Sequence, residues 1–292
     1  MISVKIIEDS ISAAGKRLTT FALTYPRIIH AELMTHRVFS RNAQSSRAIP
    51  VGKMIDKARD EMYLPEVWGL NQAGMQPQGE FLTGEEAERA NAIWKRMAEA
   101  CMQGVAELAE MNIHKQWANR PLEWFSHITV LVTATNWDNW YNLRMHPTAQ
   151  KEIRELAEGM WAAHMQSEPV ERGEILSEQS CWHLPFVTDQ ERTEHASDIP
   201  LLLKLSTARC ARVTYLKHDG VVPSVEHDIG RHDALVGDDP MHASPAEHQG
   251  IPASYSGAEY YGNFSGYIQY RKLLEADMVS RIFNGFTFST PK

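Results

Sequence analysis

Two runs of β-branched and large apolar residues stand near the start of the chain, with one turn between them. Residues 2–7 and 18–24 are rich in Ile, Val, Thr, Phe and Leu, and Gly15 lies between the two runs. This composition on either side of a turn is typical of two strands that follow each other in a sheet. Pro26 ends the second run. We predict a third strand over residues 27–35, which would bring His36 to the end of the sheet.

A further strand and two long helices are predicted later in the chain. Residues 127–135 are β-branched and predict a strand or a buried helical turn. Thr83-Gly-Glu-Glu86 fits a capping box at the start of a helix. The apolar stripe predicted for that helix consists of Ile93, Met97, Cys101, Val105 and Leu108. A second helix is predicted from Thr148, with Pro147 in its first turn. Its stripe consists of Ile153, Leu156, Met160 and His164.

The predicted fold is α/β (α+β), with a mixed or antiparallel sheet flanked by the two long helices. We expect one domain over residues 1–292, because this length can form a single large core. Loop insertions are expected at 64–83, which is rich in Pro, Gly, Asn and Gln, and at 167–200, which is rich in Pro and charged residues. The sequence has no Gly-x-Gly-x-x-Gly fingerprint, so a Rossmann flavin site is not expected.

Composition and charge restrict the class of protein. Hydrophobic residues make up 43% of the chain and charged residues 23%, as in ordinary globular proteins. The formal net charge of -8 argues against general binding of nucleic acids, which requires a basic surface. The three cysteines, Cys101, Cys181 and Cys210, are too widely spaced for a disulfide framework or a structural zinc site. We expect a cytoplasmic protein without a signal peptide or a membrane span.

The segment from Glu32 to Arg47 differs from this acidic background. It contains Arg37 and Arg41 together with several hydroxyl side chains, and no acidic residue follows Glu32 within it. Guanidinium and hydroxyl groups hold phosphates through charge-assisted hydrogen bonds. The segment is therefore interpreted as an anion site for a nucleotide phosphate, although segments of this kind also form solvated helix faces. On a helix, Arg37, Arg41 and Ser45 would share one face.

A second candidate segment mixes aromatic and polar residues. Trp137, Trp140 and Tyr141 are expected in the core or in an interface. Asn139 and Arg144 lie among them and are harder to explain as core residues. Aromatic rings beside amides and a guanidinium suit a flat heterocycle with hydrogen-bonding edges.

The basic segment resembles the signature of a known enzyme family. Residues 35–37, Thr-His-Arg, are followed by seven residues and then Ser45, which resembles the Arg-His-Arg-x7-Ser signature of the flavin-dependent thymidylate synthases. Asn42 and Arg47 also match the family pattern. The first Arg of the signature is a threonine here, and Ala43 stands where the family has an acid.

Other segments extend the resemblance in an unusual order. Residues 143–154 resemble the family's Leu-Arg…Ala-Gln-x-Glu-Ile stretch. Residues 208–215 and 242–248 resemble its Ala-Arg-Val-Ser-Tyr and His-x-Ser-Pro-Phe-Glu-His elements, which normally precede the signature. The chain therefore resembles a circularly permuted, phage-type member. Permutation is tolerated where the old termini lie close together and the new ones fall in an exposed loop.

The resemblance implies a transferase that binds FAD and makes thymidylate from dUMP. Methylenetetrahydrofolate would supply the carbon for C5, and NADPH would supply a hydride. Arg144 would contact the uracil ring and stabilise the negative charge that develops on it. The remaining residues implied to bind dUMP are Arg37, Ser45, Ser46, Arg47 and Arg120. Those implied to bind FAD are Thr35, His36, Arg37, Asn42, Thr133, Thr135, Asn139 and Ser244. The resemblance also implies a homotetramer with sites between subunits.

Other functions fit the same residues. The site could add another one-carbon group, such as hydroxymethyl, to a pyrimidine deoxynucleotide. The chain could also be a noncatalytic nucleotide-binding homologue. A metal hydrolase would use His242, His248 and His36. The flavin scheme needs no cysteine nucleophile, whereas Cys181 or Cys210 could serve as one in a different scheme.

Overall fold

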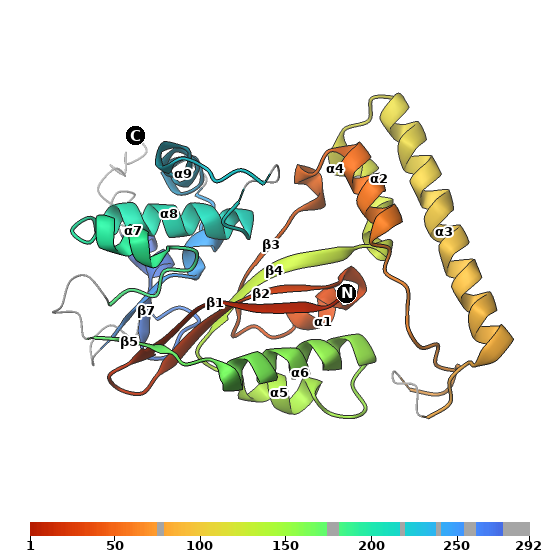
Figure 1. Ribbon diagram of the computed structural model, residues 1–292, viewed down its shortest axis with the longest axis horizontal. Coiled ribbons are helices and arrows are strands. Elements are labelled where there is room, and N and C mark those ends of the chain that lie inside the picture. The colour runs from red at the N-terminus through yellow and green to blue at the C-terminus, as the bar shows by residue number, and fades with distance from the viewer. Residues whose placement is uncertain (75–78, 174–180, 217–219, 238–240, 254–260, 277–292) are drawn as a thin grey trace, which may run out of the picture.

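A mixed five-stranded sheet forms the centre of the molecule, in the order β3-β4-β2-β1-β5 (Figure 1). The computed structural model describes residues 1–74, 79–173, 181–216, 220–237, 241–253 and 261–276. The strands are β1 (Ser3–Ser12), β2 (Arg17–Pro26), β3 (Ser40–Ala43), β4 (His127–Ala134) and β5 (Val170–Arg172). β1 and β5 are parallel, and the other neighbours are antiparallel. Helices pack on both faces of the sheet, which confirms the predicted α/β class.

The predicted hairpin at the start of the chain is confirmed. β1 and β2 pair in antiparallel register from Ser3 opposite Thr24 to Ile11 opposite Arg17. Gly15 lies in the turn with a φ of +73°, in the left-handed region that favours glycine. The predicted strand at 127–135 is also confirmed, as β4.

The strand predicted over residues 27–35 is wrong. This region forms a 3-10 turn, η1 (Arg27–Ile29), and a short helix, α1 (His30–Met34). Ile29 and Leu33 are four residues apart and are both fully buried, so the apolar pattern is helical rather than alternating. The basic segment instead contains the edge strand β3, so Arg37, Arg41 and Ser45 do not share a helix face.

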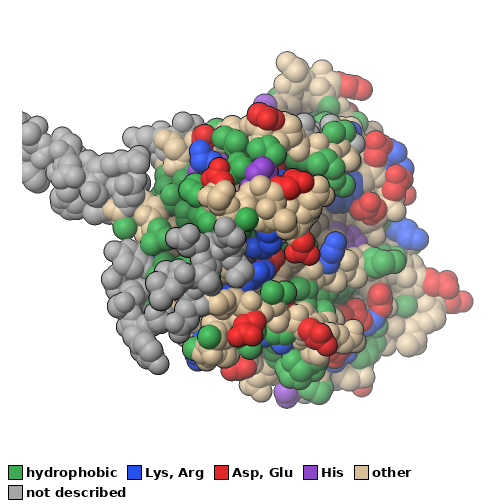
Figure 2. Space-filling view, turned by 60° about the vertical axis from the view of Figure 1, so that its left-hand side comes forward, with side chains coloured by type: hydrophobic (Ala, Val, Ile, Leu, Met, Phe, Trp, Pro, Cys, Tyr) green, Lys and Arg blue, Asp and Glu red, His purple; other side chains and the backbone are tan. Residues whose placement is uncertain are grey.

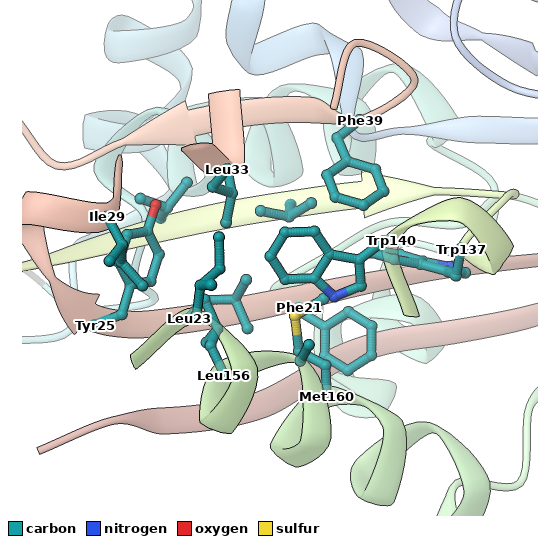
Figure 3. Packing of buried hydrophobic residues seen from close by; sticks show 14 of the residues in the cluster. Phe21, Leu23, Tyr25, Ile29, Leu33, Phe39, Trp137, Trp140, Leu156 and Met160 are labelled. Carbon is teal, nitrogen blue, oxygen red and sulfur yellow. The ribbon is translucent and has the colours of Figure 1, made fainter. Parts of the chain in front are cut away.

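The main core lies between one face of the sheet and two helices, α5 (Asp138–Arg144) and α6 (Lys151–Gln166) (Figure 3). Phe21 and Leu23 of β2 point toward Trp140, Leu156 and Met160 from these helices. All of the residues predicted for the α6 stripe are buried, because their spacing places them on one face. The helix begins at Lys151 rather than at Thr148, and Gln150 is its N-cap residue.

The predicted long helix in the middle of the chain is α3 (Gly84–Glu110), and it lies at the opposite side of the molecule from α8 (Figure 1). Thr83 is its N-cap residue, but its side chain makes no capping hydrogen bond, so the capping box does not form. The predicted stripe is also partly wrong, because Ile93 and Met97 are 40% and 43% exposed. α3 packs on α2 (Val51–Asp60) chiefly through Val105. A short helix, α4 (Lys115–Ala118), follows α3.

The last third of the chain covers the other face of the sheet and its edge at β3. Its helices are α7 (Asp189–Glu194), α8 (Ile199–Arg212) and α9 (Val225–His232), followed by the π-helical turn η4 (Asp233–Gly237) and the 3-10 turn η5 (Ser244–Glu247). β6 (Gly250–Pro252) and β7 (Tyr267–Gln269) form a separate two-stranded sheet. Cys210 and Val213 pack against Leu131 of β4, which attaches this layer to the main sheet.

The two expected loop insertions differ in content. The described part of 64–83 is irregular except for a bridge between Gly69 and Phe81. By contrast, the described residues of 167–200 include β5, α7 and the start of α8. Thr188 and Glu191 form a capping box that starts α7. Among the described residues, no helix combines the length and apolar character needed to cross a membrane.

Candidate functional site

Arg144 is the last residue of α5, and its guanidinium lies against the segment between α1 and β3. Its Nε donates a 3.0 Å hydrogen bond to Nε2 of His36. Its Nη2 donates to the carbonyl oxygen of Glu32 and to the hydroxyl of Thr35, both at 3.2 Å. We call these three acceptors the Arg144 cradle. The cradle joins two segments that are more than a hundred residues apart in sequence.

His36 is the buried member of the cradle, with 6% of its surface exposed. Its ring stacks on Phe39 at 5.6 Å between centroids and meets the edge of Trp140 at 4.8 Å. Burial, together with the positive charges of Arg144 and Arg41, lowers the pKa of His36 to about 4. The imidazole is therefore neutral near pH 7. Because a guanidinium can only donate, Nε2 is the acceptor, and the ring proton is on Nδ1.

A second group of predicted residues surrounds the carboxylate of Glu123. Glu123 belongs to the 3-10 helix η3 (Arg120–Phe125) and forms ion pairs with Arg120 at 3.0 Å and with Arg27 at 3.1 Å. The Ser46 hydroxyl, in the short turn η2 (Ser46–Ala48), also donates to it. Asn119 donates to the Ser46 carbonyl at 2.8 Å and fixes this turn against α4. Glu123 thus neutralises two arginines beside the predicted phosphate-binding residues.

The C-terminal third supplies a third group of contacts, at β3. Asn42 donates to the backbone carbonyl of Cys210 at 2.8 Å and accepts from the Ser244 hydroxyl at 3.1 Å. Gln269 donates to the Ser40 hydroxyl and to the Glu247 carbonyl, both at 3.0 Å. The segments at 208–215 and 242–248 therefore lie directly against the strand that carries Asn42.

Thr133 lies on β4 inside the sheet and is fully buried. Its hydroxyl is 2.7 Å from the Thr20 hydroxyl and 2.7 Å from Nδ1 of His248. The Thr20 hydroxyl is also hydrogen-bonded to Nε2 of His183, and Nδ1 of the same ring lies 2.8 Å from the Ser10 hydroxyl. These hydrogen bonds engage the hydroxyl of Thr133 and connect the strands β1, β2 and β4 to His248, next to η5.

The other predicted site residues lie closer to solvent. Arg37 and Asn139 are exposed. Arg47 is exposed as well, and its Nε lies 3.4 Å from the hydroxyl of Ser45. Thr135 follows β4, and its hydroxyl accepts a 2.9 Å hydrogen bond from the backbone N–H of Ser265. Among the described residues, the contacts thus bring Thr35 and His36 to Arg144, Ser46 and Arg120 to Glu123, and Ser244 to Asn42, whereas Arg37, Arg47 and Asn139 join none of these groups.

The surface charge agrees with the acidic composition. Acidic and basic side chains are interspersed on the face drawn in Figure 2. Several of the basic residues form ion pairs, as Arg27 and Arg120 do with Glu123.

Two important contacts were missed by sequence reasoning. Glu123 was not predicted, although it follows Arg120 at the i,i+3 spacing that favours an ion pair in a helix. The acceptor at Glu32 is a backbone carbonyl, and no side-chain pattern reports such a group.

The histidines and cysteines of the alternative schemes have other partners. His36 is bound to Arg144 and His248 to Thr133. Within the described ranges, no group of three or more His, Cys, Asp or Glu side chains is arranged to hold a metal ion. Burial raises the pKa of the Cys210 thiol, which makes a thiolate nucleophile unfavourable there.

Known proteins similar to this chain include one protein family and several solved structures. The family model described as thymidylate synthase complementing protein (Thy1) matches residues 16–170. Among solved structures, the UMP/dUMP methylase PolB from Streptomyces cacaoi bound with 5-Br UMP is 20% identical, with a TM-score of 0.46, and the match covers 57% of this chain and 89% of that one. Its complex with 5-Br dUMP gives 19% identity, coverage of 57% and 90%, and the same TM-score of 0.46. Thymidylate Synthase X (ThyX) from Helicobacter pylori with FAD and dUMP is 19% identical, with coverage of 50% and 67% and a TM-score of 0.35. No curated protein matches the chain.

Proposed function

Because the chain belongs to the thymidylate synthase complementing protein family, we propose that it is an FAD-dependent enzyme that transfers one carbon to C5 of dUMP. The proposed product is thymidylate, made with methylenetetrahydrofolate as carbon donor and NADPH as hydride source. The observation that carries the proposal is the position of Arg144. This half-buried guanidinium is held on one side by three acceptors, beside the segment that bears the family signature.

Arg144 is proposed to bind the uracil ring. Its Nε and Nη2 are engaged in the cradle, and no hydrogen bond engages Nη1 among the described residues. A guanidinium held in this way can direct its remaining donors at the ring carbonyl and N3. Fixed donors of this kind stabilise the negative charge that develops when C5 becomes nucleophilic. In that step the protein stabilises the negative charge and forms no covalent bond with the ring.

The phosphate and sugar of dUMP are proposed to bind to Ser45, Ser46, Arg47, Arg120 and Arg37. In the unliganded chain, Glu123 accepts from Ser46 and Arg120 and so occupies donors that a phosphate would use. A nucleotide phosphate would compete with this carboxylate, because both are anionic acceptors. Arg37 and Arg47 are exposed, so a phosphate could reach both side chains from solvent.

The residues near Asn42 fit a flavin with a pyrophosphate group. Arg37 and Asn139 are exposed, so a guanidinium and an amide are open to solvent, and Ser244 is exposed and donates to Asn42. We propose that Thr35, Arg37, Asn42, Thr135, Asn139 and Ser244 contact FAD. We propose that Thr133 and His36, whose polar groups are already engaged, support these contacts from behind. When bound, FAD would supply hydride transfer between the nicotinamide and the one-carbon unit.

Two further parts of the proposal concern assembly. Trp117 and Trp124 are 68% and 65% exposed, near the phosphate-binding group, and large exposed aromatics are typical of interfaces. We propose a homotetramer in which neighbouring subunits complete the site. We also propose that the chain is circularly permuted, because segments 208–215 and 242–248 dock on β3, although they follow it in sequence.

The decisive experiment is to incubate the purified protein with dUMP, FAD, NADPH and methylenetetrahydrofolate and to determine the mass of the nucleotide product. The mass of thymidylate supports the proposal, and the mass of hydroxymethyl-dUMP assigns the related reaction. Arg144→Gln should abolish turnover, whereas Arg154→Gln, which changes an arginine of α6 outside the proposed site, should not. A protein that binds neither FAD nor dUMP would refute the proposal. Binding of dUMP without turnover would favour the noncatalytic homologue.

A further inference from the structure

The threonine at position 35 is the clearest departure of this chain from the family signature, which has an arginine there. The Thr35 hydroxyl accepts from Nη2 of Arg144 at 3.2 Å and donates to the Glu32 carbonyl at 2.6 Å. Its hydrogen is therefore used by Glu32, and its lone pairs face Arg144. Toward Arg144 the hydroxyl can therefore act only as an acceptor, which is what a guanidinium needs.

His36 also acts as a hydrogen-bond acceptor toward Arg144. Its neutral ring presents the unprotonated Nε2 to Nε of Arg144 at 3.0 Å. The ring cannot easily turn away, because it is buried between Phe39 and Trp140. Two side chains from successive positions thus offer acceptors to adjacent donors on one edge of the same guanidinium.

We propose that Thr35 and His36 are positioning residues that together fix the orientation of Arg144 for the pyrimidine ring. This inference rests on the proposed function for its catalytic consequence, but the cradle itself is defined by contacts within the chain. An arginine at position 35 could not replace this hydroxyl as an acceptor for Arg144, because a guanidinium only donates.

The cradle should matter most in the transition state. A guanidinium that is already oriented stabilises developing charge without the cost of ordering a flexible side chain. Loss of one acceptor should therefore reduce kcat more than it raises KM for dUMP. A hydrogen bond to a charged group contributes enough for about a tenfold change in rate.

Three variants test the proposal. Thr35→Val keeps the shape of the side chain and removes the acceptor, Thr35→Ser restores it, and His36→Phe keeps an aromatic ring between Phe39 and Trp140. We expect Thr35→Val and His36→Phe to lower kcat about tenfold or more, and Thr35→Ser to recover most of it. Thr148→Val is the matched control, because the Thr148 hydroxyl bonds to His146 rather than to Arg144. Thermal unfolding of each variant shows whether it is folded.

A second readout needs no turnover. In ¹⁵N-labelled protein without ligands, the Nε–H proton of Arg144, assigned by its absence in Arg144→Lys, should exchange slowly with water. It should exchange rapidly in folded His36→Phe and remain slow in Thr148→Val. Rapid exchange of this proton in the wild-type protein, or an unchanged exchange rate in His36→Phe, would show that His36 does not hold Nε of Arg144 and would refute the cradle. If the wild-type protein does not bind dUMP but Nε–H exchange follows the expected order, the proposed function fails and the cradle stands. Equal kcat for Thr35→Val and the wild-type enzyme would refute the positioning role.

Discussion

His164 should make the stability of this protein depend on pH in a defined window. The side chain lies at the end of α6, is 7% exposed, and makes hydrogen bonds to Thr19 at 3.2 Å and to Tyr141 at 3.1 Å. Phe21 and Trp137 meet its ring edge-on. Burial, followed by the nearby charge of Arg17, lowers the pKa of His164 to about 4. The folded protein therefore resists protonation of this ring, whereas the unfolded chain takes up a proton near pH 6.5.

The sign and size of the effect follow from these two values. The stabilisation is fully present above about pH 6.5 and is lost progressively as the pH falls toward 4, because the unfolded state binds the extra proton. At pH 5 the unfolded ring is almost fully protonated and the folded ring is mostly neutral. The difference corresponds to a loss of about 1–2 kcal/mol in the free energy of unfolding between pH 7 and pH 5.

The assay is urea denaturation at pH 7 and pH 5, followed by tryptophan fluorescence. His164→Gln keeps a side chain that can bond to Thr19 and Tyr141 but removes the titrating group. The variant should be less stable at pH 7, and its loss of stability between pH 7 and pH 5 should be smaller than that of the wild-type protein by about 1–2 kcal/mol. His146→Gln, at an exposed position, is the control. The reasoning is refuted if His164→Gln and wild type lose the same stability between the two pH values.

Other outcomes follow from the remaining contacts. Glu123→Gln removes the counterion of Arg120, so calorimetry in low salt should show that dUMP binds about three- to tenfold more tightly. An unchanged affinity would show that Arg120 does not contact the phosphate of dUMP. Cys181→Ala and Cys210→Ala should each retain turnover in the mass-spectrometric assay, because the proposed reaction uses no thiol; complete loss of activity in a folded variant would contradict this. Leu156→Ala creates a cavity in the main core and should lower the free energy of unfolding, measured by urea denaturation, by about 2–5 kcal/mol. A decrease below about 1 kcal/mol would show that neighbouring side chains move to fill the cavity.

The parts of the fold that were predicted correctly have regular local patterns. The hairpin of β1 and β2, the strand β4 and the stripe of α6 all follow from apolar spacing and from Gly15. The prediction failed at residues 27–35, where β-branched residues favour a strand but Ile29 and Leu33 are buried at helical spacing. Packing of Ile29 and Leu33 into the main core therefore favours the helix over the strand.

The candidate site was harder to predict for a different reason. The pairing of Arg144 with His36 joins α5 to the turn before β3, and no local pattern encodes a contact over that separation. The resemblance to the family drew attention to both residues, but not to their bond. The stripe of α3 failed because Ile93 and Met97 face solvent in the single chain. Periodicity shows that a helix has an apolar side, but it does not show what covers that side.

The attachment of the last third of the chain to β3 has a consequence for how the protein is made. Ser244 contacts Asn42 across 202 positions and Gln269 contacts Ser40 across 229. During synthesis on a ribosome, the first three strands and β4 emerge long before these partners exist. Contacts at such separation form slowly, and until they form, the edge strand β3 lacks the cover that the last third of the chain provides. A nascent chain that stalls before residue 244 would therefore expose this edge to pairing with other chains.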